Sequence, residues 1–506
     1  MSIQPSFADF KKTHESGKSQ IVWTTLVADL ETPVSAVMKL AEGQPNSFLL
    51  ESVEGGAVRG RYSIIGLKPD LIWRCDGNEA RINRMARFDP DAYIACDEPV
   101  LDSLQSLFDE SRIDLPPNLP PMAAGLVGYM SYETVRLMEK IPDGNPDDLK
   151  IPEGMFIRPT VMAIFDSILD LVTIVTPVWA GDGRSAQDAY NHAAERIADA
   201  VHDFERSLPH SATLDAGQLD LPEPTSNTTR EEYYAMVEKA KEYIRAGDIF
   251  QVVPSQRFEL PFELPPLALY RALRRTNPSP FMFYLNFGNF SIVGSSPEIL
   301  VRLREGKVTV RPIAGTRPRG ATAAEDAALA EDLLSDPKEL AEHLMLLDLG
   351  RNDVGRVAKI GTVTVTEKMA IENYSHVMHI VSNVEGEISE GLTAVDALKA
   401  GFPAGTVSGA PKVRAMEIID ELEKSRRGIY AGAVGYLSAN GSMDTCIALR
   451  TALVKDGKVY IQAGGGVVAD SDPEAEYQET VNKAKALVRA AQEAIRYAAD
   501  TGRGNR

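Results

Sequence analysis

The sequence predicts an α+β protein in which large, mostly antiparallel β-sheets pack as a sandwich, with helices on the outer faces. Strand-like runs outnumber helix-like runs in the C-terminal half. Two of these runs contain tight-turn pairs, Asn-Gly in "ANGS" and Asp-Gly in "KDGK", which favour two-residue hairpins and hence antiparallel pairing. This pattern disfavours a parallel, doubly wound sheet and leaves the outer faces to the helices.

Residues 1–206 are predicted to form an N-terminal region of mixed strands and helices. Runs such as "QIVWTTLVADL", "NSFLLESV" and "RYSIIGL" predict strands, and "RSAQDAYNHAAERIADAVHDFERSL" predicts the clearest helix. The most apolar run, 161–179, contains Asp166 and Asp170 and many β-branched residues. We therefore expect a buried hairpin there rather than a membrane span.

Residues 207–228 are rich in Pro, Ser, Thr and Asp and show no periodicity, so they are predicted to form a linker. A helix should follow, because Thr229 and Glu232 form a capping box and apolar residues recur at helical spacing until Gly247. We expect residues 229–490 to form the second domain and residues 491–506 a C-terminal tail.

Composition limits the classes of function. The chain of 506 residues is 44% hydrophobic and 25% charged, which is typical of a globular protein. Its formal net charge of -19 argues against nucleic acid or an anionic membrane as a partner and favours small substrates. The three cysteines form no CxxC pattern, and the N-terminus does not resemble a signal peptide. We expect a cytoplasmic protein without disulfides.

Two segments, "SDPKELAEHLML" and "SDPEAEYQETVNKA", open as helices with acidic residues three apart. Glu339 and Glu342 share one helix face, as do Glu476 and Glu479. Such residues often only complement the helix dipole or form surface ion pairs. The functional alternative is Mg²⁺, which takes oxygen ligands and completes its coordination with water and substrate oxygens.

Glycines and a hydroxyl add to this hypothesis. Gly464, Gly465 and Gly466 follow a predicted strand and could turn successive backbone N–H groups toward one anion. A plain turn between strand and helix explains them equally well, and they match no nucleotide-binding motif. The "GTVSGAPK" segment offers a usable hydroxyl on Thr406.

Eight motifs in order resemble the chorismate-utilising enzymes, and among them the large components of the anthranilate synthases. The motifs are "GDIFQVVPSQR", "NPSPFMFYL", "GSSPE", "RPIAGTRPRG", "KELAEHLMLLDLGRNDVGR", "FPAGTVSGAPKVRAMEII", "DTCIALRTA" and "QAGGGVVADSDPEAEYQET". The resemblance spans nearly all of 229–486 and implies that 229–490 is the catalytic domain. It implies conversion of chorismate and ammonia to anthranilate and pyruvate with Mg²⁺, through an aminated intermediate, as the first committed step of tryptophan biosynthesis.

The resemblance also assigns roles to residues of this chain. It implies that Glu342 and Glu479 ligate Mg²⁺ directly, whereas Glu339 and Glu476 hold metal-bound waters. Substrate-binding positions are implied at Gln251, Ala314, Gly315, Thr316, Tyr430, Arg450, Gly464, Gly465, Gly466 and Lys483. A fixed guanidinium such as that of Arg450 suits bidentate recognition of a carboxylate.

Four residues have a catalytic role by the same resemblance: Glu298, His379, Glu339 and Thr406. Glu298 is the implied general acid for the departing C4 hydroxyl, which requires a carboxyl that stays protonated near neutral pH; burial beside other carboxylates would favour this. His379 is the implied base for the C2 proton. His376 should point to the opposite face of the same strand and serve another purpose.

Related enzymes run different chemistry on this scaffold. Ala314 stands where aminodeoxychorismate synthases resemble "PIKGT", and alanine cannot replace that nucleophilic lysine. Gln251 stands where isochorismate and salicylate synthases have a lysine that activates water. A non-catalytic amino-acid-binding protein on the same fold is the remaining alternative, but it would not need the acid, the base and the acidic quartet.

The chain has no nucleophile-elbow cysteine, so a glutaminase should be a separate subunit. The resemblance implies a glutamine amidotransferase partner in a hetero-oligomer, a heterotetramer, which supplies ammonia. It also implies feedback inhibition by tryptophan. The residues implied to bind the inhibitor are Glu51, Ser52, Arg61, Pro280, Phe281, Met282, Val434, Tyr436 and Asp444.

Overall fold

The computed structural model describes residues 2–41, 43–54, 58–120, 122–181, 183–208, 222–374 and 377–503. Its helices are α1 Phe7–Glu15, α2 Pro33–Leu40, α3 Val100–Glu110, α4 Ala186–Glu205, α5 Arg230–Ala246, α6 Pro266–Thr276, α7 Ala323–Ser335, α8 Pro337–Gly355, α9 Ala394–Gly401, α10 Lys412–Leu422 and α11 Pro473–Arg503, with 3-10 turns η1 Tyr132–Leu137 and η2 Gly405–Val407.

Strands outnumber helices and alternate with them. In chain order they are β1 Gln20–Val27, β2 Ser47–Glu54, β3 Val58–Asp76, β4 Glu79–Asn83, β5 Tyr93–Ala95, β6 Gly125–Met130, β7 Gly154–Asp166, β8 Leu171–Val178, β9 Thr225–Ser226, β10 Gln251–Val252, β11 Ser255–Pro261, β12 Phe281–Asn286, β13 Phe290–Ser296, β14 Ile299–Arg304, β15 Lys307–Val310, β16 Ile313–Pro318, β17 Thr364–Asn373, β18 Val377–Glu387, β19 Gly409–Ala410, β20 Ala433–Ser438, β21 Met443–Ile447, β22 Thr451–Lys455 and β23 Lys458–Gly464.

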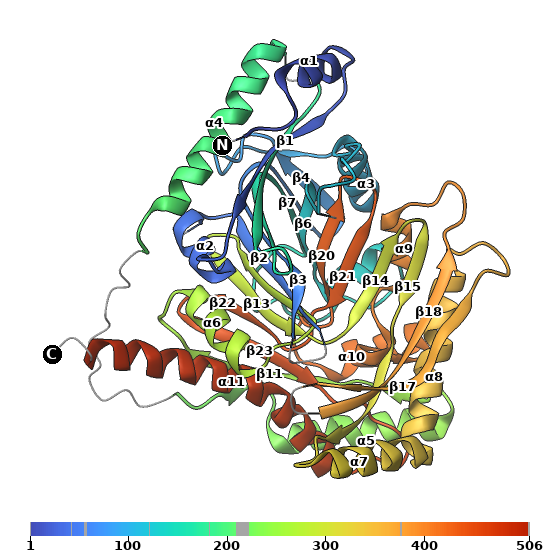
Figure 1. The fold of residues 1–506 in the computed structure, drawn as a ribbon. Helices are drawn as coiled ribbons and strands as arrows, with labels where there is room; N and C mark the ends of the chain where they lie inside the picture. Colours follow the sequence, from blue (N-terminus) through green and yellow to red (C-terminus); the bar gives the residue numbers. More distant parts are fainter. Residues whose placement is uncertain are drawn as a thin grey trace.

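Among the strands of the described residues, all but β10 and β19 form one continuous antiparallel network, and those two pair with each other. The network runs β9–β11–β23–β22–β13–β12–β2–β3–β7–β6–β20–β21–β14–β15–β18, and β16 and β17 flank β18. The predicted hairpin at 161–179 is the antiparallel pair β7 and β8. Figure 1 shows the strands at the centre of the molecule and the helices around them. The predicted α+β fold class is therefore confirmed.

The network folds over on itself to make the sandwich. Inward residues of β12, β13 and β22, such as Phe283, Ile292 and Leu453, belong to the same apolar cluster as Tyr129 of β6 and Met155 of β7. Alternate residues on the other face of β12 pack instead with helices, and Met282 shares a cluster with Leu269 of α6 and Leu487 of α11. Period-two alternation thus divides each strand between sandwich core and helix-facing core.

The two predicted tight turns differ in length. Lys455 pairs with Lys458, and Asp456 and Gly457 between them both have positive φ (50° and 71°), so this two-residue turn is confirmed. At the other turn the amide of Ser438 donates to the carbonyl of Ser442, which leaves a three-residue loop. The two-residue prediction is wrong there.

A tertiary contact explains the longer loop. The guanidinium of Arg112 donates to the carbonyl of Asn440 (3.1 Å), and a Cβ on Gly441 would lie 2.0 Å from Arg112 Nη1. Gly441 has φ 93° and closes the loop beneath this arginine. A contact with a residue more than 300 positions away is invisible to a local turn rule.

Helix α11 continues to Arg503 and so crosses the expected boundary at 490 between the second domain and the C-terminal tail. Ala491, Ala494 and Ile495 are buried in the cluster that also holds α6. Part of the predicted linker, 209–221, lies outside the described residues, whereas Thr225 and Ser226 form β9 against β11. As predicted, α5 begins at the capping box of Thr229 and Glu232 and ends at Gly247, which is left-handed.

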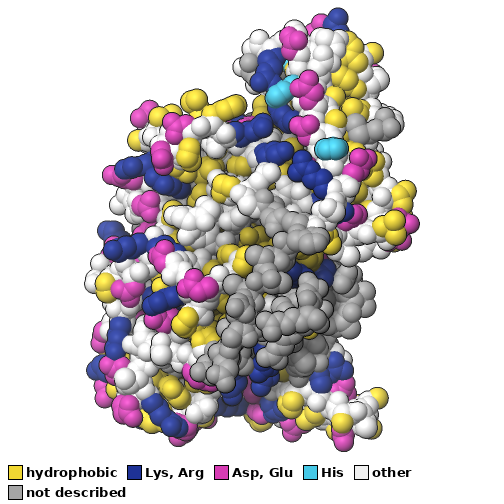
Figure 2. Space-filling view, turned by 90° about the vertical axis from the view of Figure 1, so that its left-hand side faces the viewer, with side chains coloured by type: hydrophobic (Ala, Val, Ile, Leu, Met, Phe, Trp, Pro, Cys, Tyr) yellow, Lys and Arg dark blue, Asp and Glu magenta, His cyan; other side chains and the backbone are white. Residues whose placement is uncertain are grey.

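In the described ranges, no helix combines the length and the apolar content needed to cross a bilayer. The face seen in Figure 2 carries basic and acidic side chains interspersed rather than gathered by sign.

Candidate active site

The predicted site residues come from segments far apart in the sequence, and short contacts connect them. Glu298 lies between β13 and β14, Thr406 lies in η2, and His379 lies on β18. The four acidic residues occupy the first two turns of α8 and α11. The N-terminal capping explains why both helices start just before them. Asp336 accepts from the amides of 338 and 339, and Asp472 accepts from the amide of 475.

Glu298 is a buried carboxyl with a hydroxyl bound to it. Thr406 Oγ1 lies 3.2 Å from each carboxyl oxygen of Glu298. Burial raises the pKa of Glu298 to about 8, although the bond from Thr406 and the charges of Lys483 and Arg450 lower it. The expected contribution from neighbouring carboxylates is absent from these causes, so burial and not like charge keeps this carboxyl protonated.

His379 is held in one orientation by the loop opposite it. Its Nδ1 lies 3.0 Å from the carbonyl oxygen of Gly315 and 3.1 Å from Thr316 Oγ1. Because a carbonyl only accepts, Nδ1 must carry the proton, and Nε2 is left as an acceptor. Burial lowers the pKa of His379 to about 4, so the ring is neutral at pH 7. Gly315, with φ 73°, makes the bulge in β16 that allows this contact.

Cationic and aromatic groups lie beside this pair. In the described part of the chain the guanidinium of Arg450 has no hydrogen bond or ion pair, and burial lowers its pKa. Lys483 donates to Glu479 (2.7 Å) and to the carbonyl of Gly464 (2.9 Å). Tyr430 is buried. An unpaired guanidinium in a desolvated position is suited to a bidentate carboxylate.

The glycines of the 464–466 segment separate the acidic helices. None of the three has positive φ, and the use of their amides to bind an anion stays a prediction. Close packing explains these glycines. A Cβ at 464 would lie 2.7 Å from Tyr430 Oη, one at 465 would lie 3.0 Å from Glu476 Oε2, and one at 466 would lie 2.5 Å from Gln251 Nε2. The amide of Gly465 donates to Pro254 O (3.2 Å), so it is already used.

The carboxylates on α8 and α11 fit a hard divalent cation in chemistry. Burial raises the pKa of Glu339, and Glu342 raises it further; burial also raises the pKa of Glu476, with a smaller contribution from Glu479. Glu476 Oε2 is buried without a hydrogen-bond partner. Gln251 Nε2 donates to Glu342 Oε1 (2.8 Å) and so orients that carboxylate. A cation would relieve the crowding of negative charge.

These carboxylates do not form a closed cage. Within the ranges described above, no three Asp, Glu, His or Cys side chains lie close enough together to hold a metal ion by themselves. An open arrangement of carboxylates suits Mg²⁺, which usually takes one or two protein carboxylates and completes its octahedral coordination with water and substrate oxygens. The residues present fit such an ion when a carboxylate ligand accompanies it.

The residues predicted to bind an inhibitor divide between two faces of the sheet. Val434, Tyr436 and Phe281 contact the sandwich core, whereas Met282 faces the helices. Glu51, opposite Met282, also faces the helices, where Tyr270 and Arg274 bind its carboxylate at 2.5 to 2.8 Å.

The carboxylate of Glu51 is thus already bound by a cationic guanidinium and a phenol hydroxyl. Asp444 is the other acidic residue of the predicted set. It pairs with Arg302 (3.0 Å) and Arg304 (3.4 Å), but its Oδ1 is buried without a partner. Arg61 pairs with Asp166 at 2.8 Å and is half exposed. Ser52 and Pro280 are partly buried.

Several functional candidates gave no signal in the sequence. Tyr374 packs edge-on against the ring of His379, with centroids 5.3 Å apart. Arg427 and Glu423 form a fully buried ion pair behind Thr406 and Tyr430. A cavity of about 20 Å³ adjoins Glu298 and Thr406 and reaches Asp353, which pairs with Lys412. Only the contacts, and no spacing pattern, identify these residues; His376 lies outside the described residues.

Known proteins are similar to this chain in sequence and in fold. A family described as chorismate binding enzyme matches residues 61–489. A protein of Cereibacter sphaeroides named anthranilate synthase component 1 is 62% identical over 500 residues, which cover 99% of this chain and 100% of the relative. A protein of the same name from Pseudomonas putida is 50% identical over 474 residues, covering 92% and 93% of the two chains.

Solved structures of known proteins also have this fold. The crystal structure of anthranilate synthase component I from Streptococcus pneumoniae has a TM-score of 0.74 at 37% identity and covers 85% of this chain and 92% of its own. The menaquinone-specific isochorismate synthase of Escherichia coli has a TM-score of 0.70 at 21% identity, covering 94% and 95%, and shares the fold.

Proposed function

The chain belongs to the chorismate-binding enzymes, among the anthranilate synthase component 1 proteins, and we propose that it converts chorismate and ammonia to anthranilate and pyruvate. The single observation that carries this reaction is the pair Glu298 and His379. Burial gives both residues the neutral form at pH 7, one as an acid and the other as a base. Titratable groups pushed apart in this way mark acid and base roles.

In the first proposed step ammonia forms the bond to C2 of the ring and the bond from C4 to its hydroxyl breaks. Hydroxide is a poor leaving group, so the proton of Glu298 joins it and water departs. Thr406 holds the Glu298 carboxyl in place through its two contacts. The nitrogen on C2 is then an ammonium group, and it loses one proton. Return of one proton to the Glu298 carboxylate restores its neutral form.

In the second step Nε2 of His379 removes the proton at C2. The bond between C3 and the enolpyruvyl oxygen breaks, the ring becomes aromatic, and the enolpyruvyl group leaves and takes a proton to become pyruvate. The carbonyl of Gly315 accepts from Nδ1 and so keeps the proton on that nitrogen, which leaves Nε2 as the basic nitrogen. Arg450 and Tyr430 are proposed to bind the enolpyruvyl carboxylate.

Mg²⁺ is the proposed cofactor, with Glu342 and Glu479 as its protein ligands and Glu339 and Glu476 holding its waters. When bound, Mg²⁺ supplies the positive charge that lets a substrate carboxylate lie against an acidic protein surface. The orphaned Glu476 Oε2 and the orienting bond from Gln251 to Glu342 support this assignment.

Gln251 and Ala314 favour this reaction over those of related enzymes. Neither side chain can act as the lysine that activates water or attacks the ring. Gln251 is moreover committed to Glu342. Ammonia, which is already a nucleophile, needs no such base.

We further propose that the ammonia comes from a separate glutamine amidotransferase subunit in a hetero-oligomer. The component naming of the relatives supports a partner subunit. Free ammonium salts should therefore replace glutamine in an assay of this chain alone.

Feedback inhibition by tryptophan is proposed at the sandwich face that carries Phe281, Val434 and Tyr436. Tyr436 stands opposite Asp444 in the β20–β21 register, and the unpartnered Asp444 Oδ1 offers an acceptor for an ammonium. Asp444→Asn should weaken inhibition by tryptophan about tenfold or more and should leave the turnover without tryptophan unchanged. Unchanged inhibition would remove Asp444 from the site.

The reaction is tested by following anthranilate fluorescence from the purified chain with chorismate, Mg²⁺ and excess ammonium at mildly alkaline pH. We expect anthranilate and pyruvate in equal amounts, and loss of both when Mg²⁺ is chelated or Glu342 is changed to Gln. Isochorismate or an aminated product without pyruvate would contradict the proposal.

A further inference from the structure

Arg427 is buried in the protein behind the candidate site, with 2% of its surface exposed. It precedes the site segment that contains Tyr430, and Glu423, four residues earlier, binds its guanidinium through both carboxylate oxygens. A buried charge pair is costly to desolvate and adds little net stability compared with apolar residues of the same size. Its presence here therefore points to a role other than stability.

The guanidinium reaches backbone carbonyls in two different site segments. Its Nη1 donates to Val407 O at 2.7 Å, next to Thr406, and its Nη2 donates to Val253 O at 2.6 Å, two residues after Gln251. Its plane also lies over the ring of Tyr430, 5.3 Å from the centroid. One side chain thus touches three segments, each carrying a candidate substrate or acid-orienting residue.

Glu423 extends the same arrangement. Its Oε1 accepts from the amide and the hydroxyl of Ser255, both at 2.8 Å, which fixes the chain just after Val253. The segments are also bonded to each other, since the amide of Val253 donates to Ser408 O at 3.0 Å. The pair therefore lies at the junction where β10, η2 and the turn before β20 meet.

We infer that Arg427, oriented by Glu423, is a positioning residue that holds Thr406, Gln251 and Tyr430 in register around the substrate. The inference rests on the proposed function. The planar guanidinium has five donors in a fixed fork, and four bonds with defined directions use four of them. A lysine has the same charge but cannot reproduce that geometry.

The N-terminal region fixes the other side of this residue. The carboxylate of Glu133 in η1 accepts from the amides of Arg427 (2.8 Å) and Gly428 (2.9 Å), and burial raises the pKa of Glu133 to about 7. The ring of Tyr132 lies 4.7 Å from the guanidinium. The backbone of the positioning segment is therefore anchored in the N-terminal half of the chain.

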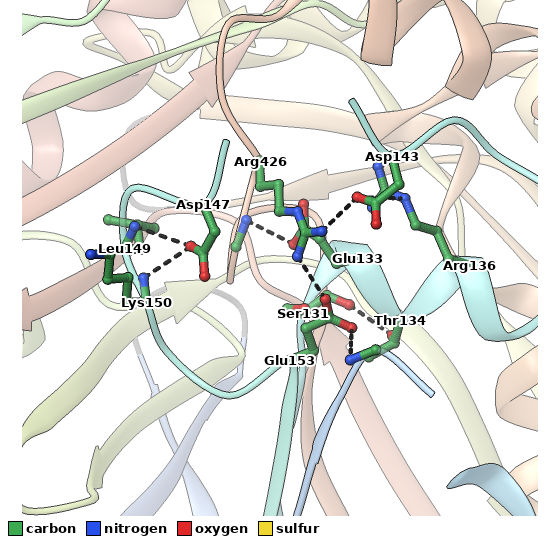
Figure 3. A network of polar contacts seen from close by, with 12 residues as sticks. Ser131, Glu133, Thr134, Arg136, Asp143, Asp147, Leu149, Lys150, Glu153 and Arg426 are labelled. Atoms are coloured by element: carbon green, nitrogen blue, oxygen red, sulfur yellow. Dashed lines mark hydrogen bonds and ion pairs between the residues drawn. The ribbon is translucent and has the colours of Figure 1, made fainter. Parts of the chain in front are cut away.

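The neighbouring arginine provides a matched control. Figure 3 shows Arg426 bound to Asp143 and Glu153, at 2.7 and 3.0 Å, on loops of the N-terminal region. Among the described residues its side chain pairs with these two carboxylates and makes no hydrogen bond to Thr406, Gln251 or Tyr430. Arg426 and Arg427 are thus adjacent, both charged and both paired, but only Arg427 reaches the site.

The test compares kcat and KM for chorismate in Arg427→Lys, Glu423→Gln and Arg426→Gln. Misplacement of site groups by about 1 Å costs on the order of 100-fold in rate, so we expect kcat of Arg427→Lys to fall by about that factor, with a smaller fall for Glu423→Gln. Thermal unfolding of both should stay within a few degrees of the parent. Arg426→Gln should keep the parental kcat and KM.

A second measurement separates positioning from folding. In the double variant of Arg427→Lys with Thr406→Val, the losses in kcat should be less than multiplicative, because both changes act through Thr406. Multiplicative losses, parental kcat in Arg427→Lys, or loss of folding in both Arg427→Lys and Glu423→Gln would each overturn the inference. An inactive parent chain would instead refute the proposed function.

Discussion

At the scale of single residues, burial is the largest cause of the shifted pKa of both Glu298 and His379. Both side chains are less than one-tenth exposed. Burial disfavours the charged form, so it raises the pKa of the carboxyl to about 8 and lowers that of the imidazole to about 4. The same physical cause thus produces a neutral acid and a neutral base among the predicted site residues.

Replacing Glu298 with Gln should abolish most turnover. The amide keeps the shape and can still accept from Thr406, but it has no proton to give to the departing hydroxyl, and general acid catalysis contributes about 10²- to 10⁴-fold. The measurement is kcat by anthranilate fluorescence. Retained stabilisation by chorismate in a thermal-shift assay would show that binding survives; undiminished kcat would exclude Glu298 as the acid.

The pH dependence follows from the same two groups. Glu298 must be protonated and His379 must be neutral, so activity should be flat between about pH 4 and 8 and fall as Glu298 ionises above about pH 8. The profile of kcat/KM must be measured at constant free ammonia, since ammonium itself loses a proton on the alkaline side. A basic limb near the ordinary pKa of a glutamate would contradict the assignment.

Gly466 is expected to be essential for the orientation of the metal ligands. A Cβ there would lie 2.5 Å from Gln251 Nε2 and 3.7 Å from Glu342 Oε1. Gly466→Ala should therefore displace Gln251, release Glu342 from its hydrogen bond, and weaken Mg²⁺ binding roughly tenfold, as is typical for loss of a residue that orients a ligand. Calorimetric titration with Mg²⁺ in the presence of chorismate measures this. Gly391→Asn, at an open left-handed position, serves as the control.

At the scale of elements, α11 connects the site to the core. Its first turns carry Glu476, Glu479 and Lys483, and its later turns bury Ala491 and Ile495 against the cluster that holds α6. The expected boundary at 490, between the second domain and the tail at 491–506, therefore falls within this helix. Burial against another element determines the length of a helix more strongly than propensity does.

Truncating Ile495 should therefore destabilise the protein. Ile495→Ala removes buried methyl groups and should cost about 2 to 4 kcal/mol of unfolding free energy. The adjacent Arg496→Ala breaks only the exposed pair with Glu493 and should change it by less than about 1 kcal/mol. Urea unfolding measures both. Equal effects of the two substitutions would mean that the end of α11 is not packed.

At the scale of the whole molecule, the two halves of the chain share one sheet. β2 pairs with β12, and β6 pairs with β20, so the N-terminal strands lie between strands of the catalytic half. The boundary expected from composition near 207–228 is thus a boundary along the chain only. Antiparallel pairing across it satisfies edges that either half alone would expose.

Thermal unfolding should then show one cooperative transition. Neither half has a complete sandwich core, since Phe283 and Tyr129 share one cluster but come from different halves. Calorimetry should give a single peak, and residues 1–208 expressed alone should be aggregated or lack a cooperative transition. Two separated peaks, or a stable soluble N-terminal fragment, would contradict this.

Much of the site could be foreseen from the sequence because its residues stand in motifs. The caps before α8 and α11, the acidic pairs and the capping box of α5 depend on residues within four positions, and local hydrogen bonds decide them. The two-residue Asp456-Gly457 turn has the same local origin. The resemblance to the chorismate-utilising enzymes, which rests on many motifs, added the predicted roles of the acid, the base and the carboxylate-binding arginine.

Tertiary structure decided what depends on neighbours far away along the chain. It paired Glu51 with Arg274, widened the turn at Gly441 beneath Arg112, and buried Arg427 between segments from three parts of the sequence. It also set the protonation of Glu298 and His379. The sequence by itself determined the fold class and which side chains are available for chemistry; only the folded chain determined their solvation and partners, because burial and long-range contacts exist only after packing.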